Sequence, residues 1–249
     1  MNETICTIMK RGSLRRYKEE NISDEHLDII LNAAMRAPTA GNMMTYSIIT
    51  VRKEETKKKL AISCDNQPFI AKAPLILIFL ADYSKWYKYY EVNGVREFQK
   101  DRGETFAGPS AGSFVLAVQD AVIAAESLGI GSCYIGDIME QKEYHKTLFN
   151  LPEYVFPVAM LTLGYYPEDY MVPLKERFAE KYVVFEERYN ELSKEDIDDM
   201  FRKRDQLFTA KNKYNAKNYA QMHYNFKVKA PFSKEMQRSV EEALKEFFK

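Results

Sequence analysis

The sequence is poor in the residues that carry most side-chain chemistry. It has three cysteines, three histidines and one tryptophan among 249 residues. Cys6, Cys64 and Cys133 form no Cys-x-x-Cys pair and no even disulfide framework, which favours a reduced, cytoplasmic setting. The histidines lie far apart in the sequence, so a zinc site built from His and Cys is not expected, and we predict no metal centre.

Excess charge and long apolar runs are also missing. Lys and Arg number 36 against 36 Asp and Glu, and a net charge of zero argues against a dedicated nucleic-acid-binding protein. The longest apolar run, residues 73–81, has nine residues and contains Pro74, whereas a helix needs ~20 apolar residues to span a bilayer. The first ten residues lack the apolar run of a signal peptide. We therefore expect a cytoplasmic protein that binds neither membrane nor nucleic acid.

The hydrophobic pattern predicts an α+β fold with four strands wrapped by helices. Strands are expected at residues 46–51, 75–80, 132–135 and 158–163. Helices are expected around residues 5–9, from Ser23 to just before Pro38, over 54–62, 114–128 and 139–149, and from Ser193 and Ser233 onward. Met236, Val240, Leu244 and Phe247 form the expected inward stripe of the last helix. Because the chain becomes polar and rich in Tyr and Lys near residue 175, we predict a core of residues 1–174 and an extension of residues 175–249.

Residues 108–112, Gly-Pro-Ser-Ala-Gly, match the Gly-x-Ser-x-Gly nucleophile elbow. That motif requires a buried strand directly before the serine, but residues 100–105 are polar and charged. A turn that leads into a helix from Phe114 explains the glycines and Pro109 more simply. A serine hydrolase that uses Ser110 is therefore a remote alternative.

A second pattern lies between Lys211 and Lys229, which holds five lysines and no acids, interleaved with aromatic residues. Such a mixture can bind single-stranded nucleic acid. The neutral net charge instead favours a long, irregular arm that packs its aromatic rings on another surface and leaves its lysines in water. A local positive field can also attract an anionic cofactor.

The most informative cluster is Arg11-Gly12-Ser13-Leu14-Arg15, which places two guanidinium groups and a hydroxyl within five residues. Guanidinium groups match phosphate bidentately, and a serine hydroxyl adds a donor. Taken alone, the cluster also fits a solvated basic turn, because Lys10 and Arg16 extend it.

Several segments in order carry a family resemblance. Residues 11–17 resemble the Arg-Ser-x-Arg-x-aromatic signature of the nitroreductase family of FMN flavoproteins. Further segments are similar to motifs of the same family: Ala37-Pro38-Thr39-Ala40-Gly41-Asn42, Asn66-Gln67-Pro68, residues 124–131 with Tyr134-Ile135-Gly136, residues 151–157 and 163–165, and Pro173-Leu174-Lys175-Glu176-Arg177. The last resembles the Lys-x-Arg of the larger NADPH-linked nitroreductase and flavin reductase subgroup. The resemblance runs over roughly residues 5–190.

The resemblance implies a nitroreductase-like fold: a central mixed, mostly antiparallel sheet of about four to five strands, wrapped by helices, in an intertwined homodimer. FMN is then the cofactor, and the C-terminal extension wraps the core or the partner. The implied activity is transfer of two electrons from NAD(P)H to nitroaromatic, quinone or flavin acceptors by a ping-pong mechanism. Flavin N5 carries the chemistry, so no catalytic side chain is implied. The alternative is a flavin-binding or redox-sensing protein with little turnover.

The resemblance also implies site residues. Arg11, Ser13, Arg15, Lys175 and Arg177 correspond to residues that hold the FMN phosphate and ribityl chain, and Gly12 and Leu14 belong to the same segment. Gln67 corresponds to a residue that bonds the isoalloxazine edge. The remaining implied cofactor contacts are Tyr134, Ile135, Gly136 and Asp137, which line the flavin, and Thr39, Ala40, Gly41 and Asn42, which approach the flavin of the partner subunit.

Two residues depart from the family pattern. Gly12 stands where many members have a second basic residue. Asp137 replaces a glycine, which brings bulk and a negative charge, and a carboxylate near the flavin is expected to lower its reduction potential. The acceptor is not indicated, although aromatic residues between Asp82 and Phe106 either cover its site or, as we expect, belong to a helix that packs them into the core.

Overall fold

The computed structural model describes residues 1–95 and 102–247, with side chains for 1–95 and 115–247. The chain forms two compact units, one of residues 1–174 and 235–249 and the other of residues 175–234. The expected division into a core of residues 1–174 and an extension of residues 175–249 stays a prediction.

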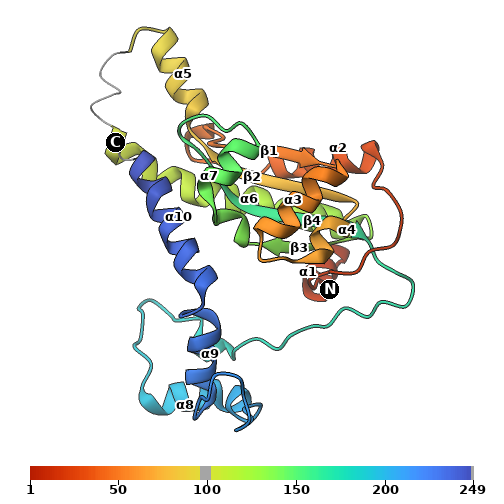
Figure 1. Ribbon diagram of the computed structural model, residues 1–249, viewed down its shortest axis with the longest axis vertical. Coiled ribbons are helices and arrows are strands. Elements are labelled where there is room, and N and C mark those ends of the chain that lie inside the picture. The colour runs from red at the N-terminus through yellow and green to blue at the C-terminus, as the bar shows by residue number, and fades with distance from the viewer. Residues whose placement is uncertain (96–101, 248–249) are drawn as a thin grey trace. The chain divides into compact units, whose positions relative to one another are not determined.

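A four-stranded sheet lies at the centre of the first unit (Figure 1). Its strands are ordered β1 (Tyr46–Val51), β2 (Leu75–Asp82), β4 (Val155–Tyr165) and β3 (Ile130–Ile135), and each pairing is antiparallel. One isolated parallel bridge joins Ser13 to Ser132 of β3. The predicted α+β fold with a mostly antiparallel sheet is confirmed, although the four named strands pair only antiparallel and the sheet is mixed only through this isolated bridge. β1 has the predicted bounds, and the other strands are longer than predicted.

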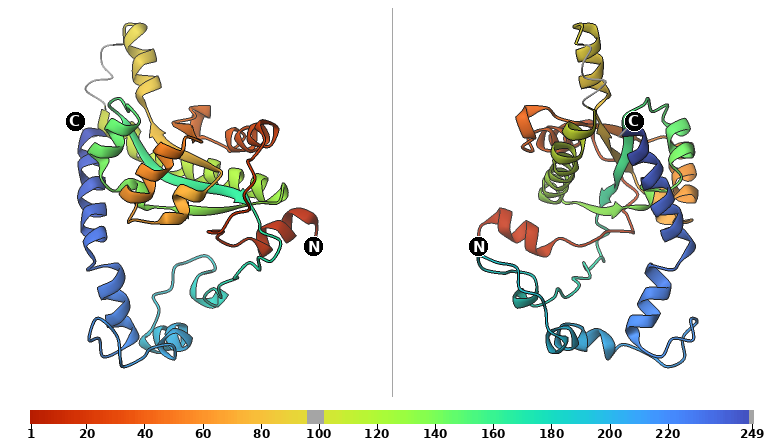
Figure 2. Two further views of the ribbon diagram at one scale, coloured as in Figure 1. Left: turned by 45° about the vertical axis from the view of Figure 1, so that its right-hand side comes forward. Right: turned by 90° about the vertical axis from the view of Figure 1, so that its left-hand side faces the viewer.

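Strand β2 explains why helices cover both faces of this sheet. All eight of its residues are buried. Because side chains alternate along a strand, Leu77 and Phe79 face α2 (Asp24–Met35) and α6 (Arg102–Ser127), while Ile76 and Ile78 face α3 (Glu54–Ser63) and α4 (Pro68–Lys72). The right-hand view of Figure 2 shows the sheet between α6 and α3. Burial of each large apolar side chain stabilises the fold by ~1.5–3 kcal/mol. Because β2 carries such side chains on both faces, a helix layer on each face is needed to exclude water from them.

The N-terminal helices begin at polar caps, as the sequence predicts for α2. The Ser23 hydroxyl accepts the His26 N–H at 3.1 Å, and α2 ends at Met35, before Pro38. Helix α1 (Glu3–Lys10) is capped by Asn2. Three apolar side chains of α1 remain exposed: Ile5, Ile8 and Met9.

The other helices are shorter or lie toward the C-terminus. In the first unit they are η1 (Ala40–Asn42), α5 (Ser84–Val92), η3 (Asp137–Met139) and α7 (Lys142–Leu148). In the second unit they are η4 (Glu180–Tyr182), α8 (Lys194–Asp205) and α9 (Tyr219–Lys227), and α10 (Pro231–Phe247) ends in the first unit. Within the described part of the chain, no helix combines the length and apolar character that a membrane crossing demands.

Helix α6 begins at Arg102, so the prediction of a turn at residues 108–112 was wrong. The downstream stripe of Ala117, Val118, Ala121 and Val122 is buried against the sheet, and this packing outweighs the low helix propensity of the glycines. The described residues directly before the elbow motif, 102–107, are therefore helical and do not form the strand that the motif requires. The Ser110 side chain lies outside the described side chains.

The last helix was also predicted imperfectly. Helix α10 begins at Pro231 rather than Ser233, and Leu244 is 47% exposed instead of facing inward. The buried face is centred on Ser239 and Ala243. The Ser239 hydroxyl donates to the Met139 carbonyl at 2.6 Å, and this bond sets the helix rotation that an apolar stripe alone does not reveal.

The second unit contains more regular structure than the predicted irregular arm. Ser193 begins α8 with a capping box, and residues 219–227 of the lysine-rich segment form α9. Lys213 and Lys227 lie against the Phe226 ring, at 5.9 and 4.8 Å from its centroid. These lysines thus contact the aromatic residues of their own segment.

Gly164 of β4 offers a test of how closely the N-terminal segment packs on the sheet. A Cβ at this position lies 2.6 Å from Cδ1 of Tyr17 and 2.9 Å from Cδ of Pro74. Gly164→Ala is therefore expected to lower the free energy of unfolding by about 1–3 kcal/mol in urea denaturation of the cofactor-free protein. Gly136→Ala is the control, because its nearest neighbour is 3.9 Å away. Equal stability of the two variants would contradict this packing.

Candidate functional site

The segment from Arg11 to Lys18 lies against strands β3 and β4. Three hydrogen bonds hold it there: Leu14 N–H to the Ser132 carbonyl at 2.8 Å, Tyr17 hydroxyl to Thr162 Oγ1 at 2.8 Å, and Lys18 N–H to the Tyr165 carbonyl at 3.0 Å. Leu14 is completely buried. The predicted phosphate-binding segment is therefore hydrogen-bonded to the sheet, while the side chains of Ser13, Arg15 and Arg16 remain exposed to solvent.

Two glycines, which have no side chain, make this close approach possible. A Cβ on Gly131 of β3 lies 2.6 Å from Cδ2 of Leu14 and 2.6 Å from the Tyr166 ring. A Cβ on Gly12 overlaps Cγ1 of Val172. The departure at Gly12 thus has a steric reason, because a basic side chain at residue 12 does not fit unless Val172 moves.

Arg11, directly after α1, has an unusual environment. Its Nε and Nη2 atoms are buried and have no hydrogen-bond partner among the described residues, and its guanidinium lies 5.3 Å from the centroid of the Tyr134 ring. The Ser132 hydroxyl in the sheet is also buried, and no group in the described part of the chain bonds to it. Burial raises the pKa of Glu126, while the Arg11 charge opposes the rise. Buried donors without acceptors are costly, so this arrangement fits an anion such as the FMN phosphate.

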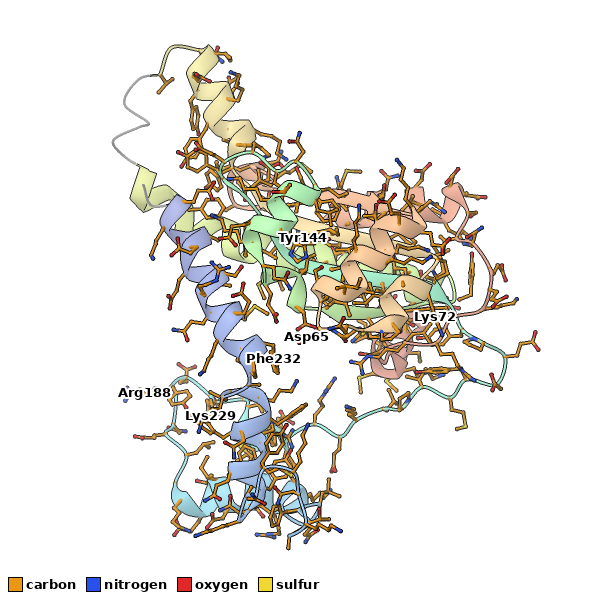
Figure 3. All side chains as sticks on the ribbon, in the orientation of Figure 1. Asp65, Lys72, Tyr144, Arg188, Lys229 and Phe232 are labelled. Atoms are coloured by element: carbon orange, nitrogen blue, oxygen red, sulfur yellow. The ribbon has the colours of Figure 1, made fainter. Side chains whose placement is uncertain are left out.

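Arg15 is held in a different way. Its Nε donates to Sγ of Cys133 at 3.4 Å, a bond that raises the pKa of Arg15, and its guanidinium lies 5.5 Å from the centroid of Phe69. It also lines a cavity of about 660 Å³ together with Phe69 and with Lys72, which is labelled in Figure 3. The cavity places further positive charge beside Arg15. Ser13 lies between the two arginines, and its carbonyl accepts from Tyr170.

Gln67 and Asp137 meet although 70 residues separate them in the sequence. Gln67 precedes α4, Asp137 begins η3 directly after β3 and Gly136, and Gln67 Nε2 donates to Asp137 Oδ2 at 2.6 Å. On the adjoining strand Ile135 is buried. Tyr134 donates to Gln119 at 2.9 Å, and burial raises its pKa to about 12.

Asp137 belongs to a cluster of three acids. One carboxylate oxygen each of Asp65, Asp137 and Glu140 lies within 4.8 Å of the others. Glu140 is only 2% exposed, and its Oε1 has no hydrogen-bond partner in the part of the chain that the structure describes. Burial, with Asp65, Asp137 and Glu235 nearby, raises the pKa of Glu140 to about 7. This end of β3 is therefore acidic, whereas the segment from Arg11 to Arg15 is basic.

The other predicted site residues lie elsewhere. Thr39 precedes η1, where Ala40, Gly41 and Asn42 are exposed, and the Thr39 hydroxyl accepts the Met44 N–H at 3.2 Å. Their approach to a partner's flavin stays a prediction. Lys175 and Arg177 belong to the second unit, so their convergence with Arg11 and Arg15 also stays a prediction.

Sequence reasoning missed three residues that contact the basic segment. Phe69 and Cys133 contact Arg15, and Ser132 bonds to Leu14. Phe69 lies directly after the Asn-Gln-Pro motif, and residues 132 and 133 lie directly before Tyr134. Proximity to a motif was therefore an available signal, but the identity of each contact required the fold.

Comparison with known proteins identifies the family. The family model described as "Nitroreductase family" matches residues 8–165. FMN reductase [NAD(P)H] of Bacillus subtilis (strain 168) is 32% identical over 191 residues, which cover 76% of this chain and 75% of that protein. The structure of B. megaterium NfrA2 has a TM-score of 0.83 at 34% identity and covers 98% of both chains. The structure of NADPH:FMN oxidoreductase from Vibrio harveyi complexed with NAD+ has a TM-score of 0.77 at 25% identity and covers 97% of this chain and 98% of that one. On this evidence, and with the basic segment in place beside β3, the chain belongs to the nitroreductase family.

Proposed function

We propose that this chain is an FMN-dependent oxidoreductase that moves two electrons from NAD(P)H to a small aromatic acceptor. The observation that carries the proposal is that two guanidinium nitrogens of Arg11, Nε and Nη2, are buried without a hydrogen-bond partner among the described residues, within a nitroreductase fold. The activities in the names of relatives, such as FMN reductase [NAD(P)H] and NADPH-flavin oxidoreductase, support the same conclusion.

The chain's own residues bind and orient the cofactor. Arg11, Ser13 and Arg15 bind the phosphate and ribityl chain, with Lys175 and Arg177 added from the second unit. Gly12 and Leu14 keep the segment close to the sheet. Gln67 bonds the ring edge, and residues 134–137 line the ring. Bound FMN supplies two-electron transfer at N5, so no side chain has to act as a nucleophile or base.

We further propose a homodimer in the cytoplasm and a ping-pong mechanism with nitroaromatic, quinone or free flavin acceptors. The exposed Ile5, Ile8 and Met9 on α1 support a partner, since grouped apolar side chains on a surface favour association. In the dimer, residues 39–42 approach the partner's flavin. A single slot for nicotinamide and acceptor requires that the first leaves before the second enters.

A flavin-binding or redox-sensing protein with little turnover is the second candidate. Asp137 favours it, because a carboxylate beside the ring opposes the negative charge of reduced flavin. The two candidates differ in whether reduced nicotinamide reduces the bound flavin.

The first test is therefore the colour and reduction of the purified protein. We expect a yellow protein whose flavin is released by acid and whose visible absorbance bleaches when it is mixed anaerobically with NADPH or NADH. Colourless protein that takes up no added FMN would refute the main proposal. Bound flavin that neither nucleotide bleaches would support the second candidate instead.

Arg15→Ala tests the phosphate assignment. Loss of charge-assisted hydrogen bonds worth about 1.5–3 kcal/mol should weaken FMN binding roughly tenfold to hundredfold, as measured by fluorescence titration of the cofactor-free protein. Arg16→Ala is the matched control, because the exposed Arg16 pairs with Asp169 at 2.8 Å. If both variants bind FMN as the unaltered protein does, Arg15 does not hold the phosphate.

Asp137→Gly tests the charge beside the ring. Removal of a negative charge should raise the flavin reduction potential by on the order of 30 mV, which corresponds to about 1.4 kcal/mol for two electrons. Glu55→Gln is the control, because it removes a charge from the exposed face of α3. The potentials are compared by anaerobic dye equilibration, and a fall in Asp137→Gly would overturn the electrostatic argument.

A further inference from the structure

The side-chain amide of Gln67 has no hydrogen-bond donor left to offer. Its Nε2 donates to the Cys64 carbonyl at 2.9 Å and to Asp137 Oδ2 at 2.6 Å. An amide nitrogen carries two N–H groups, and these two bonds use both. Only the carbonyl oxygen, Oε1, remains available to a ligand.

The chemistry of the two partners fixes this orientation. The Cys64 carbonyl is an acceptor, and the Asp137 carboxylate is an acceptor when ionised. A turned amide would place Oε1 against two other oxygens and lose both bonds. The assignment of nitrogen and oxygen therefore follows from the neighbours.

The backbone around Gln67 is fixed as well. Its N–H donates to the Ala61 carbonyl at 2.8 Å, and its carbonyl accepts the Ile70 N–H at 3.1 Å. Asp65 and Asn66 before it have left-handed φ values of 60° and 52°, which form the tight turn out of α3. Figure 3 shows where Asp65 lies in the fold. Gln67 is thus held at its main chain and at its amide nitrogen.

Asp137 is the part of this arrangement that is specific to the chain. It begins η3, and its carbonyl accepts the Glu140 N–H at 3.0 Å, so its position is set by the turn after β3. Its carboxylate lies within 4.8 Å of those of Asp65 and Glu140, and a carboxylate in acidic surroundings gains from a donor. Glycine at residue 137 would leave one N–H of Gln67 without this partner, so that N–H could be offered to a ligand while the other keeps its bond to the Cys64 carbonyl.

We infer that Asp137 is a positioning residue that holds Gln67 so that only its carbonyl oxygen faces the ring, and that Gln67 accepts a hydrogen bond from the cofactor. This inference rests on the proposed function, in which Gln67 contacts the isoalloxazine edge. Oxidised isoalloxazine carries one N–H, at N3, whereas N1, N5 and both carbonyl oxygens are acceptors. The ring atom that Gln67 recognises is therefore N3–H.

Two FMN analogues test this inference through affinity alone. In 3-methyl-FMN the N3–H donor is replaced, and in 5-deaza-FMN the N5 acceptor is replaced by C–H. The cofactor-free protein is titrated with FMN and each analogue, and dissociation constants are measured by equilibrium dialysis. We expect 3-methyl-FMN to bind about tenfold more weakly than FMN, the equivalent of about 1.4 kcal/mol, and 5-deaza-FMN to bind within about threefold of FMN.

The variants separate positioning from charge and from steric effects. In Asp137→Gly the N–H that Asp137 no longer accepts can donate to an acceptor of the ring, so the gap between FMN and 3-methyl-FMN should shrink to less than about threefold. Asp137→Ala is a second variant with the same expectation. Asp65→Asn is the matched control, because it removes an equal charge from the same cluster and leaves Asp137 in place to bond Gln67. It should keep the tenfold gap.

Equal binding of all three flavins by the unaltered protein would overturn the inference. An unchanged affinity gap in both Asp137 variants would do so as well, because it would indicate a steric effect of the methyl group. An equal loss of the gap in Asp65→Asn would also overturn it, because it would indicate a charge effect. Failure of the unaltered protein to bind FMN itself would instead refute the proposed function. The two failures are therefore distinguishable in the same titration.

Discussion

The close packing of residues 11–18 on strands β3 and β4 determines the rest of the candidate site. The hydrogen bond from Leu14 N–H to the Ser132 carbonyl exists because Gly131 has no side chain to hold the two backbones apart. From this one contact follow the positions of Arg11 over Tyr134 and of Arg15 beside Cys133. Contacts with the sheet thus restrain two guanidinium groups, although Arg15 stays exposed, and a restrained group loses less entropy when it binds an anion.

Strand β3 lies between a basic and an acidic region. Arg11 and Arg15 contact Tyr134 and Cys133 of this strand. Asp137, directly after the strand, lies close to Asp65 and Glu140. Because 36 basic residues balance 36 acidic ones, net charge alone conceals this arrangement. The basic end suits a phosphate. At the acidic end, burial together with the neighbouring carboxylates raises the pKa of Glu140 to about 7.

The sequence predicted what depends on local pattern and missed what depends on distant neighbours. The bounds of β1, the Ser23 cap and the burial of β2 follow from alternation, capping and apolar runs. The start of α6 did not, since packing of its later turns outweighs the glycines before them. Likewise, the steric role of Gly12 depends on Val172, and the bond from Gln67 depends on Asp137. No local rule joins residues 70 or more positions apart in this way.

The scarcity of histidine and cysteine fits an enzyme whose cofactor carries the reaction, and it moves the question of specificity to the residues around that cofactor. A cation in the position proposed for Arg11 suits the phosphate of any nucleotide-like cofactor, so it does little to distinguish one such cofactor from another. Recognition of the isoalloxazine edge is more selective than recognition of the phosphate. An amide that offers only an acceptor can bond only to a donor on the ring, and an amide that offers only a donor can bond only to an acceptor. In the arrangement that we infer, Asp137 sets that choice indirectly, because it accepts one N–H of Gln67. The replacement of glycine by Asp137 therefore adds bulk and charge, and in this inference it also decides whether Gln67 donates or accepts the hydrogen bond to the ring.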